Sequence, residues 1–243
     1  SLEKAGLFIR HAAASGADII CFPEQFATGW DPASHQNLGD ADSGILPALR
    51  KYARDADICI LGSLRERASP CPRNTAIAIG RDGSILATYA KIHLFSPGEE
   101  NKSFTAGTEL GIFSVGSLKC GIAICYDLRF PELFSAYAAR GVQAVIVPAA
   151  WPAVRLRHWE IFITSRAAEN QMYVIGVNTT GTTPVDTYAG ASMAADPSGT
   201  IISRAGDAEQ LIFTDIDPAL ADTTRAAFPV ARDRRNALYR DLG

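Results

Sequence analysis

The fold of this chain is decided by residues 119–132, which read KCGIAICYDLRFPE. The apolar run from Gly121 to Ile124 has the length and composition of a buried strand. Pro131 suits the first turn of a helix, because the N–H that proline lacks would have no partner there. The stretch therefore predicts a strand, a sharp turn and a helix, with Cys125 at the turn.

This position gives Cys125 two interpretations. A thiol that lies where a strand ends beside a helix N-terminus is open to a ligand, and the N–H groups there favour its thiolate. Free cysteines are also among the most frequently buried residues, so a packed structural thiol is the alternative. Other residues have to decide between the two.

Length and composition limit the classes of function. The chain has 243 residues, 47% of them hydrophobic and 20% charged, which suits a single domain over residues 1–243. The net charge of −3 offers no basic field to nucleic acid and no polybasic patch to anionic lipid. No apolar run has the length of a membrane span, and no signal-peptide pattern is present. We therefore expect a small-molecule substrate, with no nucleic-acid or membrane partner.

The cysteines and glycines point to no cofactor. Five cysteines without CxxC or Cys/His metal spacing indicate reduced thiols in a cytoplasmic protein and no metal site. No GxGxxG or P-loop pattern follows a strand, so nucleotide binding is not expected.

Strand and helix signals alternate along the chain. Helical periodicity marks residues 2–13, 45–56 and 156–171 and the segment after Pro131. Apolar or alternating runs predict strands at residues 19–22, 58–62, 74–79, 84–89, 112–115, 121–124, 142–147, 173–177, 189–195, 200–203 and 211–216.

Polar residues fall where the predicted strands end. Glu24, Lys91, Cys125, Trp151 and Asn178 each follow or close an apolar run. Ligands of open α/β sheets bind at the carboxyl ends of the strands. An acid, a lysine and a thiol there would supply a base, a cation for an oxyanion and a nucleophile, which is an apparatus for acyl transfer. Taken alone, the acid reads equally as a loop carboxylate and the lysine as a solvated strand end.

Four blocks carry a resemblance to a known family. Residues 22–24 (FPE), 89–95 (YAKIHLF), 120–132 and 166–171 (RAAENQ) resemble the nitrilase superfamily of carbon–nitrogen hydrolases, in the family's order. The resemblance places the family's catalytic Glu, Lys and Cys at Glu24, Lys91 and Cys125.

Many family members use a second glutamate in the loop after the lysine. Glu99 and Glu100 are both candidates here, and the spacing to Phe104 and Gly107 favours Glu100.

The resemblance also implies an architecture and an assembly. Family members are α/β proteins, four-layer αββα sandwiches that dimerise through a helix face, and residues 228–235 resemble segments that reach a partner subunit. Family domains begin with a strand before the first helix, whereas this sequence runs from Ser1 directly into a helical pattern. We therefore expect that something upstream has been removed and that one sheet lacks its first strand.

A mechanism follows from the family's residue types. Glu24 would take the thiol proton, while the Lys91 ammonium and the Tyr126 backbone N–H would face the oxyanion. His93 and His158 are alternative bases in a Cys/His scheme.

The expected substrate comes from the segments around the nucleophile. Residues 125–130 and 150–160 resemble the amidase branch that includes ω-amidases, which act on monoamides of short dicarboxylates. Trp151 would wall the pocket, and Arg155 or Arg129 could bind a substrate carboxylate through a bidentate pair. Arg129 could equally pair with Glu132. Nitrile and N-carbamoyl hydrolysis use the same three residues and stay open, as does a catalytically silent α/β binding module.

Overall fold

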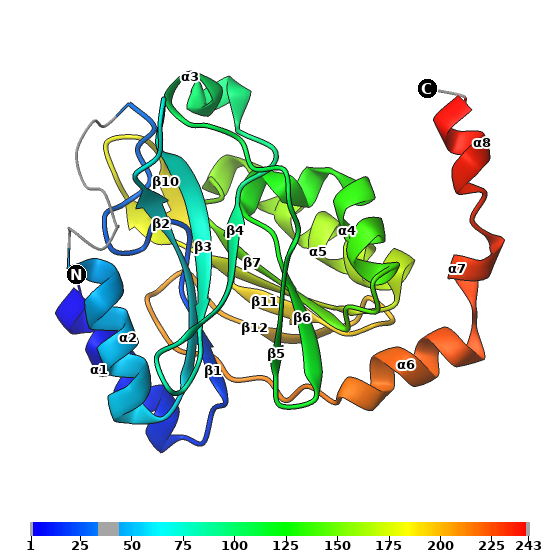
Figure 1. The fold of residues 1–243 in the computed structure, drawn as a ribbon, viewed down its shortest axis with the longest axis horizontal. Coiled ribbons are helices and arrows are strands. Elements are labelled where there is room, and N and C mark those ends of the chain that lie inside the picture. The colour runs from blue at the N-terminus through cyan, green and yellow to red at the C-terminus, as the bar shows by residue number, and fades with distance from the viewer. Residues whose placement is uncertain (1, 34–43, 242–243) are drawn as a thin grey trace.

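The computed structural model of the protein describes residues 2–33 and 44–241, so Ser1 lies outside the described part. Figure 1 shows sheets in the middle of the molecule with helices covering them on both sides. None of the described helices combines the length and the apolar character that crossing a membrane requires.

Four strands of the described chain form the first sheet, in the order β1-β2-β3-β4. Its members are β1 (Ile19–Cys21), β2 (Cys59–Glu66), β3 (Arg73–Ile79) and β4 (Ile85–Ala90), with β1 parallel to β2 and the others antiparallel. Helices α1 (Leu2–Ala14) and α2 (Ile45–Ala56) cover its outer face. Ile9 and Leu49 of these helices pack with Ile60 and Ile77, because the apolar stripe of each helix faces the sheet.

Six described strands form the second sheet, in the order β12-β11-β8-β7-β6-β5. Its members are β5 (Gly111–Val115), β6 (Leu118–Ile122), β7 (Ala144–Ala149), β8 (Tyr173–Asn178), β11 (Met193–Ala195) and β12 (Ile201–Arg204). Strands β6, β7 and β8 are parallel, and every residue of β7 is buried, which explains its unbroken apolar sequence.

Helices α4 (Pro131–Ala138) and α5 (Leu156–Asn170) cover the outer face of the second sheet. The fully buried rings of Tyr137 and Trp159 lie close to the strands. A Cβ on Gly121 would lie 2.7 Å from the Tyr137 ring, so glycine is required for this approach. Pro131 is the first residue of α4, as predicted.

The main core lies between the two sheets. Leu61 and Ala78 of the first sheet belong to the same buried cluster as Ile122 and Val145 of the second. Helices, sheet, sheet and helices therefore stack as the αββα sandwich that the family resemblance implies.

The strands of the last third differ from the prediction in three places. Residues 211–216 form no strand and pair with none of the described strands. The strand predicted over 189–195 begins only at Met193, because Gly190 and Ala191 have φ values of 62° and 55°. A short hairpin, β9 (Thr180–Thr182) with β10 (Thr187–Ala189), was not predicted.

The first sheet forms with β1 at its edge. Among the described strands β1 pairs with β2 alone, and a cavity of about 280 Å³ borders it. Apolar side chains of Phe8, Ile20 and Leu211 line this cavity, which reaches the catalytic candidate Glu24 but not Cys125.

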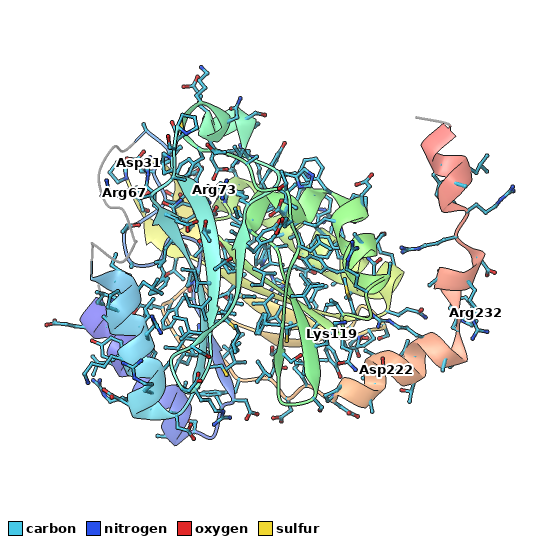
Figure 2. The ribbon with its side chains drawn as sticks, in the orientation of Figure 1. Asp31, Arg67, Arg73, Lys119, Asp222 and Arg232 are labelled. Atoms are coloured by element: carbon cyan, nitrogen blue, oxygen red, sulfur yellow. The ribbon has the colours of Figure 1, made fainter. Side chains whose placement is uncertain are left out.

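The C-terminal segment leaves the body of the molecule. Helix α6 (Pro218–Ala227) lies against it, whereas α7 (Val230–Asp233) and α8 (Asn236–Asp241) extend away from it as an arm (Figure 1). The predicted role of this tail in a dimer stays a prediction. Figure 2 shows Asp222 on α6 and Arg232 farther along the arm, and Asp222 accepts a hydrogen bond of 2.8 Å from Gln143.

Candidate active site

The strand ends bring three of the predicted residues to one buried place. Glu24 follows β1, Lys91 follows β4 and Cys125 follows β6. Glu24 and Lys91 are in direct contact, and Glu100 of the short helix α3 (Glu100–Ser103) joins them.

Lys91 lies between two carboxylates. Its Nζ is 2.9 Å from Glu24 Oε1 and 2.8 Å from Glu100 Oε2, and all three side chains are at most 1% exposed. Glu99 instead points to solvent with 69% of its side chain exposed and pairs with Lys102. The structure thus brings Glu100, and not Glu99, to the lysine.

Asn74 closes a ring with these three residues, and the sequence reading did not single it out. Its Nδ2 donates to Glu24 Oε1 at 2.7 Å and to Glu100 Oε1 at 3.0 Å. The second oxygen of Glu24 accepts the backbone N–H of Ala150 at 3.0 Å. An asparagine at the start of a strand gives no sequence signal, because its partners come from two distant loops.

The ring separates the pKa values of its two acids. Burial, together with the charge of Glu100, raises the pKa of Glu24 despite the nearby ammonium. Burial also opposes ionisation of Glu100, but attraction and hydrogen bonding to Lys91 outweigh it and hold the pKa of Glu100 below its usual value. The two carboxylates likewise outweigh burial at Lys91 and keep its pKa well above the ordinary range. The directions of these pKa shifts favour an ion pair between Lys91 and Glu100 and make Glu24 the group better suited to exchange a proton.

Cys125 lies at the predicted turn, in a strained backbone conformation. Its φ is 44°, in the left-handed region that residues other than glycine seldom adopt, and a 3₁₀ turn over Cys125–Arg129 follows. Burial, and next the negative charge of Glu24, raise the pKa of the thiol well above its usual value, while Lys91 and the Ala150 N–H act in the opposite direction. Burial thus outweighs the groups that favour a thiolate. The thiol needs a base.

Neither histidine is engaged as that base. His93 Nδ1 lies 2.8 Å from Asp127 Oδ1, and its ring stacks on Phe130 at 3.7 Å. His158 is exposed and lies 5.9 Å from the ring of Phe162.

Aromatic rings contact two arginines, of which Arg129 lies four residues after Cys125 in the chain. The Arg129 guanidinium lies 4.8 Å from the ring of Trp151 and 5.8 Å from that of Tyr126. The Arg155 guanidinium lies 5.6 Å from the ring of Phe95. Asn178 holds the backbone of Trp151, because its Oδ1 accepts the Trp151 backbone N–H at 2.7 Å.

No carboxylate of the described chain forms an ion pair with either guanidinium, and the alternative pair between Arg129 and Glu132 does not form. Burial lowers the pKa of the Arg129 guanidinium, and the positive charge of Arg155 acts in the same direction. Two guanidiniums without a carboxylate partner in the described chain therefore lie close enough to act on each other. Among the described residues, no group of three or more His, Cys, Asp or Glu side chains is placed to hold a metal ion.

The profile described as "Carbon-nitrogen hydrolase" matches residues 1–226. This chain belongs to the carbon–nitrogen hydrolase family. The 2-oxoglutaramate amidase of Bacillus subtilis (strain 168) is 34% identical to this hydrolase over 241 residues, which cover 98% of this chain and 93% of that protein. Omega-amidase NIT2 of Homo sapiens is 33% identical over 254 residues, which cover 98% of this chain and 91% of that protein.

Solved structures agree with this membership. An amidase from Nesterenkonia sp. superposes on this hydrolase with a TM-score of 0.89 and 27% identity, covering 100% of this chain and 89% of that chain. Another structure, of a mutant of the amidase from Nesterenkonia sp. AN1, shows Michael addition of acrylamide at the active site cysteine. The predicted family, the fold and the assignment as an amidase acting on carbon–nitrogen bonds are confirmed.

Proposed function

We propose that this hydrolase deamidates the ω-amide of a short dicarboxylate through a thioester on Cys125. The observation that carries the proposal is the pair of guanidiniums, Arg129 and Arg155, which have no carboxylate partner in the described chain and lie against the rings of Trp151 and Phe95. A distal substrate carboxylate would neutralise them, and arginine binds carboxylates in bidentate fashion. The printed activities of the curated relatives support the same substrate class.

In the first step Glu24 removes the thiol proton as Sγ attacks the amide carbonyl. Glu24 Oε1 already accepts from Lys91 and Asn74, whereas Oε2 accepts only from Ala150 N. We therefore assign Oε2 as the proton acceptor. The amide C–N bond breaks as the proton passes from Glu24 to the departing nitrogen, which leaves as ammonia.

The oxyanion of this step requires donors. Lys91 has three N–H groups, two of which are directed at Glu24 and Glu100. The third, together with the Tyr126 backbone N–H, is assigned to the oxyanion, where one such donor contributes about 10²–10³ in rate. Glu100 acts through Lys91 by keeping it charged and fixed.

In the second step Glu24 is again ionised and takes a proton from water. The hydroxide formed attacks the thioester carbonyl, the C–S bond breaks, and the thiolate recovers its proton from Glu24. Trp151 walls the acyl pocket, and Arg129 and Arg155 hold the second carboxylate.

The test compares succinamate with butyramide, an amide of the same chain length with a methyl group in place of the carboxylate. We expect Arg129→Met and Arg155→Met to lower kcat/KM for succinamate about 10- to 100-fold, since a hydrogen bond to a charged group contributes about 1.5–3 kcal/mol. Butyramide turnover should stay unchanged. Arg157→Met, a matched change at a neighbouring exposed arginine, should affect neither substrate.

Two results would contradict the substrate assignment. One is a wild type that does not distinguish succinamate from butyramide. The other is turnover confined to a nitrile or an N-carbamoyl compound.

We also infer a homodimer in the cytoplasm. The C-terminal segment carries exposed Phe228 and Tyr239, whose burial needs a partner surface, and its extended course supports a second copy as that partner. The five cysteines are all free, which suits a reducing compartment. Light scattering that returned only a 26.0 kDa species would contradict the dimer.

A further inference from the structure

Asp127 is a fully buried carboxylate that takes no part in the chemistry proposed above. Four donors surround it. Its Oδ2 accepts from Ile124 N at 2.9 Å and from Tyr89 Oη at 2.8 Å, while its Oδ1 accepts from His93 N at 2.9 Å and lies 2.8 Å from His93 Nδ1. A buried charge with this many partners is a fixed point of the structure.

The donors come from the two segments that carry the proposed nucleophile and cation. Ile124 directly precedes Cys125 in the chain, and Tyr89 and His93 stand two residues before and after Lys91. One carboxylate thus joins the turn that holds the thiol to the strand end that holds the ammonium.

The turn needs such a restraint. Cys125 has a φ of 44°, and a strained backbone of this kind persists only where surrounding contacts determine it. The bond from Ile124 N to Asp127 Oδ2 closes the turn around Cys125. Without it the backbone is free to relax toward ordinary dihedral angles, which would move Sγ relative to Glu24 and Lys91.

We propose that Asp127 is a positioning residue, which sets the distance between the Cys125 thiol and the Lys91 ammonium through one backbone hydrogen bond to each segment. It touches no reacting atom. The inference rests on the proposed function of Cys125 and Lys91, and it assigns to Asp127 a requirement that only a carboxylate meets.

That requirement follows from the donors. Each oxygen of Asp127 accepts one backbone N–H, from Ile124 on one side and from His93 on the other. Asparagine has a single acceptor oxygen. In either orientation of the amide, its NH₂ would face one of these backbone N–H groups, donor against donor. Asp127→Asn must therefore release one of the two segments.

The test measures kcat and KM for ammonia release, together with the rate at which iodoacetamide alkylates Cys125. In Asp127→Asn we expect kcat to fall roughly 10²-fold with little change in KM, because a displacement of about 1 Å can cost that much. Alkylation should slow as well, since Cys125 loses its position relative to its base. Asp196→Asn is the matched control, because Asp196 also accepts backbone N–H groups but lies in a remote turn.

Tyr89→Phe separates positioning from stability. It removes one donor to Asp127 and leaves both backbone bonds, so we expect a lower unfolding midpoint in urea with kcat and alkylation close to wild type. The proposal would be overturned by an unchanged kcat in Asp127→Asn. It would also be overturned by a loss of kcat in Tyr89→Phe as large as in Asp127→Asn, or by an Asp127→Asn chain that does not fold even with a stabilising osmolyte. Because alkylation does not depend on amide hydrolysis, failure of the proposed function would be seen separately, as amide turnover that persists after Cys125 is alkylated.

Discussion

Replacing Glu100 by glutamine removes one of the two charges that hold Lys91 while keeping the shape of the side chain. In the native site Glu100 Oε2 lies 2.8 Å from Lys91 Nζ and accepts the Phe95 N–H at 2.7 Å, and Oε1 accepts from Asn74 at 3.0 Å. Glutamine has one acceptor oxygen, so its NH₂ must face one of these donors. The change breaks a buried ion pair and leaves a buried donor without a partner.

The expected magnitude follows from burial. Removing one partner of a buried ion pair costs about 3–5 kcal/mol of unfolding free energy. Lys91 keeps Glu24 as its counterion, which places this loss at the lower end, about 3 kcal/mol. Glu99→Gln is the control, because the Glu99–Lys102 pair is more than two-thirds exposed and surface pairs contribute little.

The same change alters the base. The negative charge of Glu100 helps to raise the pKa of Glu24, so its removal lowers that pKa. Because Glu24 must be ionised to accept the thiol proton, the acid limb of kcat/KM should move to lower pH. At the pH optimum kcat should fall, since Glu24 becomes a weaker base and Lys91 is less firmly placed.

Urea unfolding and the pH profile of ammonia release measure both effects. Glu99→Gln should match wild type in each. An acid limb that stays in place in Glu100→Gln, or equal losses in the two variants, would contradict this role of Glu100.

Two further predictions concern the nucleophile and the base. Cys125→Ala should abolish ammonia release, and full turnover in this variant would exclude Cys125 as the nucleophile. Intact-mass analysis of wild type quenched with a slow amide should show the acyl group on the peptide that contains Cys125. In wild type the acid limb of kcat/KM should lie above pH 4.5, the ordinary glutamate pKa, because burial raises the pKa of Glu24. Activity appears only as the pH rises through the pKa of Glu24. An acid limb at or below pH 4.5 would show that Glu24 is not the base.

The catalytic candidates were predictable because each follows an apolar run. Glu24, Lys91 and Cys125 lie where strands end, and a strand end is visible in a sequence as the point where apolar residues give way to polar ones. The contact between Glu24 and Lys91 was not visible, since these residues follow β1 and β4, which lie at opposite edges of the first sheet. The choice between Glu99 and Glu100 rested on spacing alone, whereas in the structure burial separates them clearly.

Asn74 and Asp127 show what the sequence could not supply. Asn74 begins a strand, and its partners Glu24 and Glu100 are 50 and 26 residues away in the chain. Asp127 lies inside the quoted motif, but its donors on either side of Lys91 become neighbours only when the sheets stack. Periodicity reports which face a residue occupies and says nothing of which polar group lies opposite.

The failed strand at residues 211–216 has a related cause. Alternating apolar residues such as Leu211 and Phe213 satisfy the pattern of a strand, yet a strand also needs a neighbour with free backbone groups. The alternation can be read from the sequence, whereas the presence of a neighbouring strand depends on how the sheet assembles.

The ring of Glu24, Lys91, Glu100 and Asn74 has a consequence for the total charge of the interior. Before reaction the ring holds two carboxylates and one ammonium, so it carries one net negative charge beside a neutral thiol. When the proton moves from Cys125 to Glu24, the ring becomes neutral and the sulfur becomes negative. The interior therefore gains no new ion, and one negative charge changes its place. Creating an isolated ion in a medium of low polarity is costly, whereas moving an existing one toward the Lys91 ammonium is not.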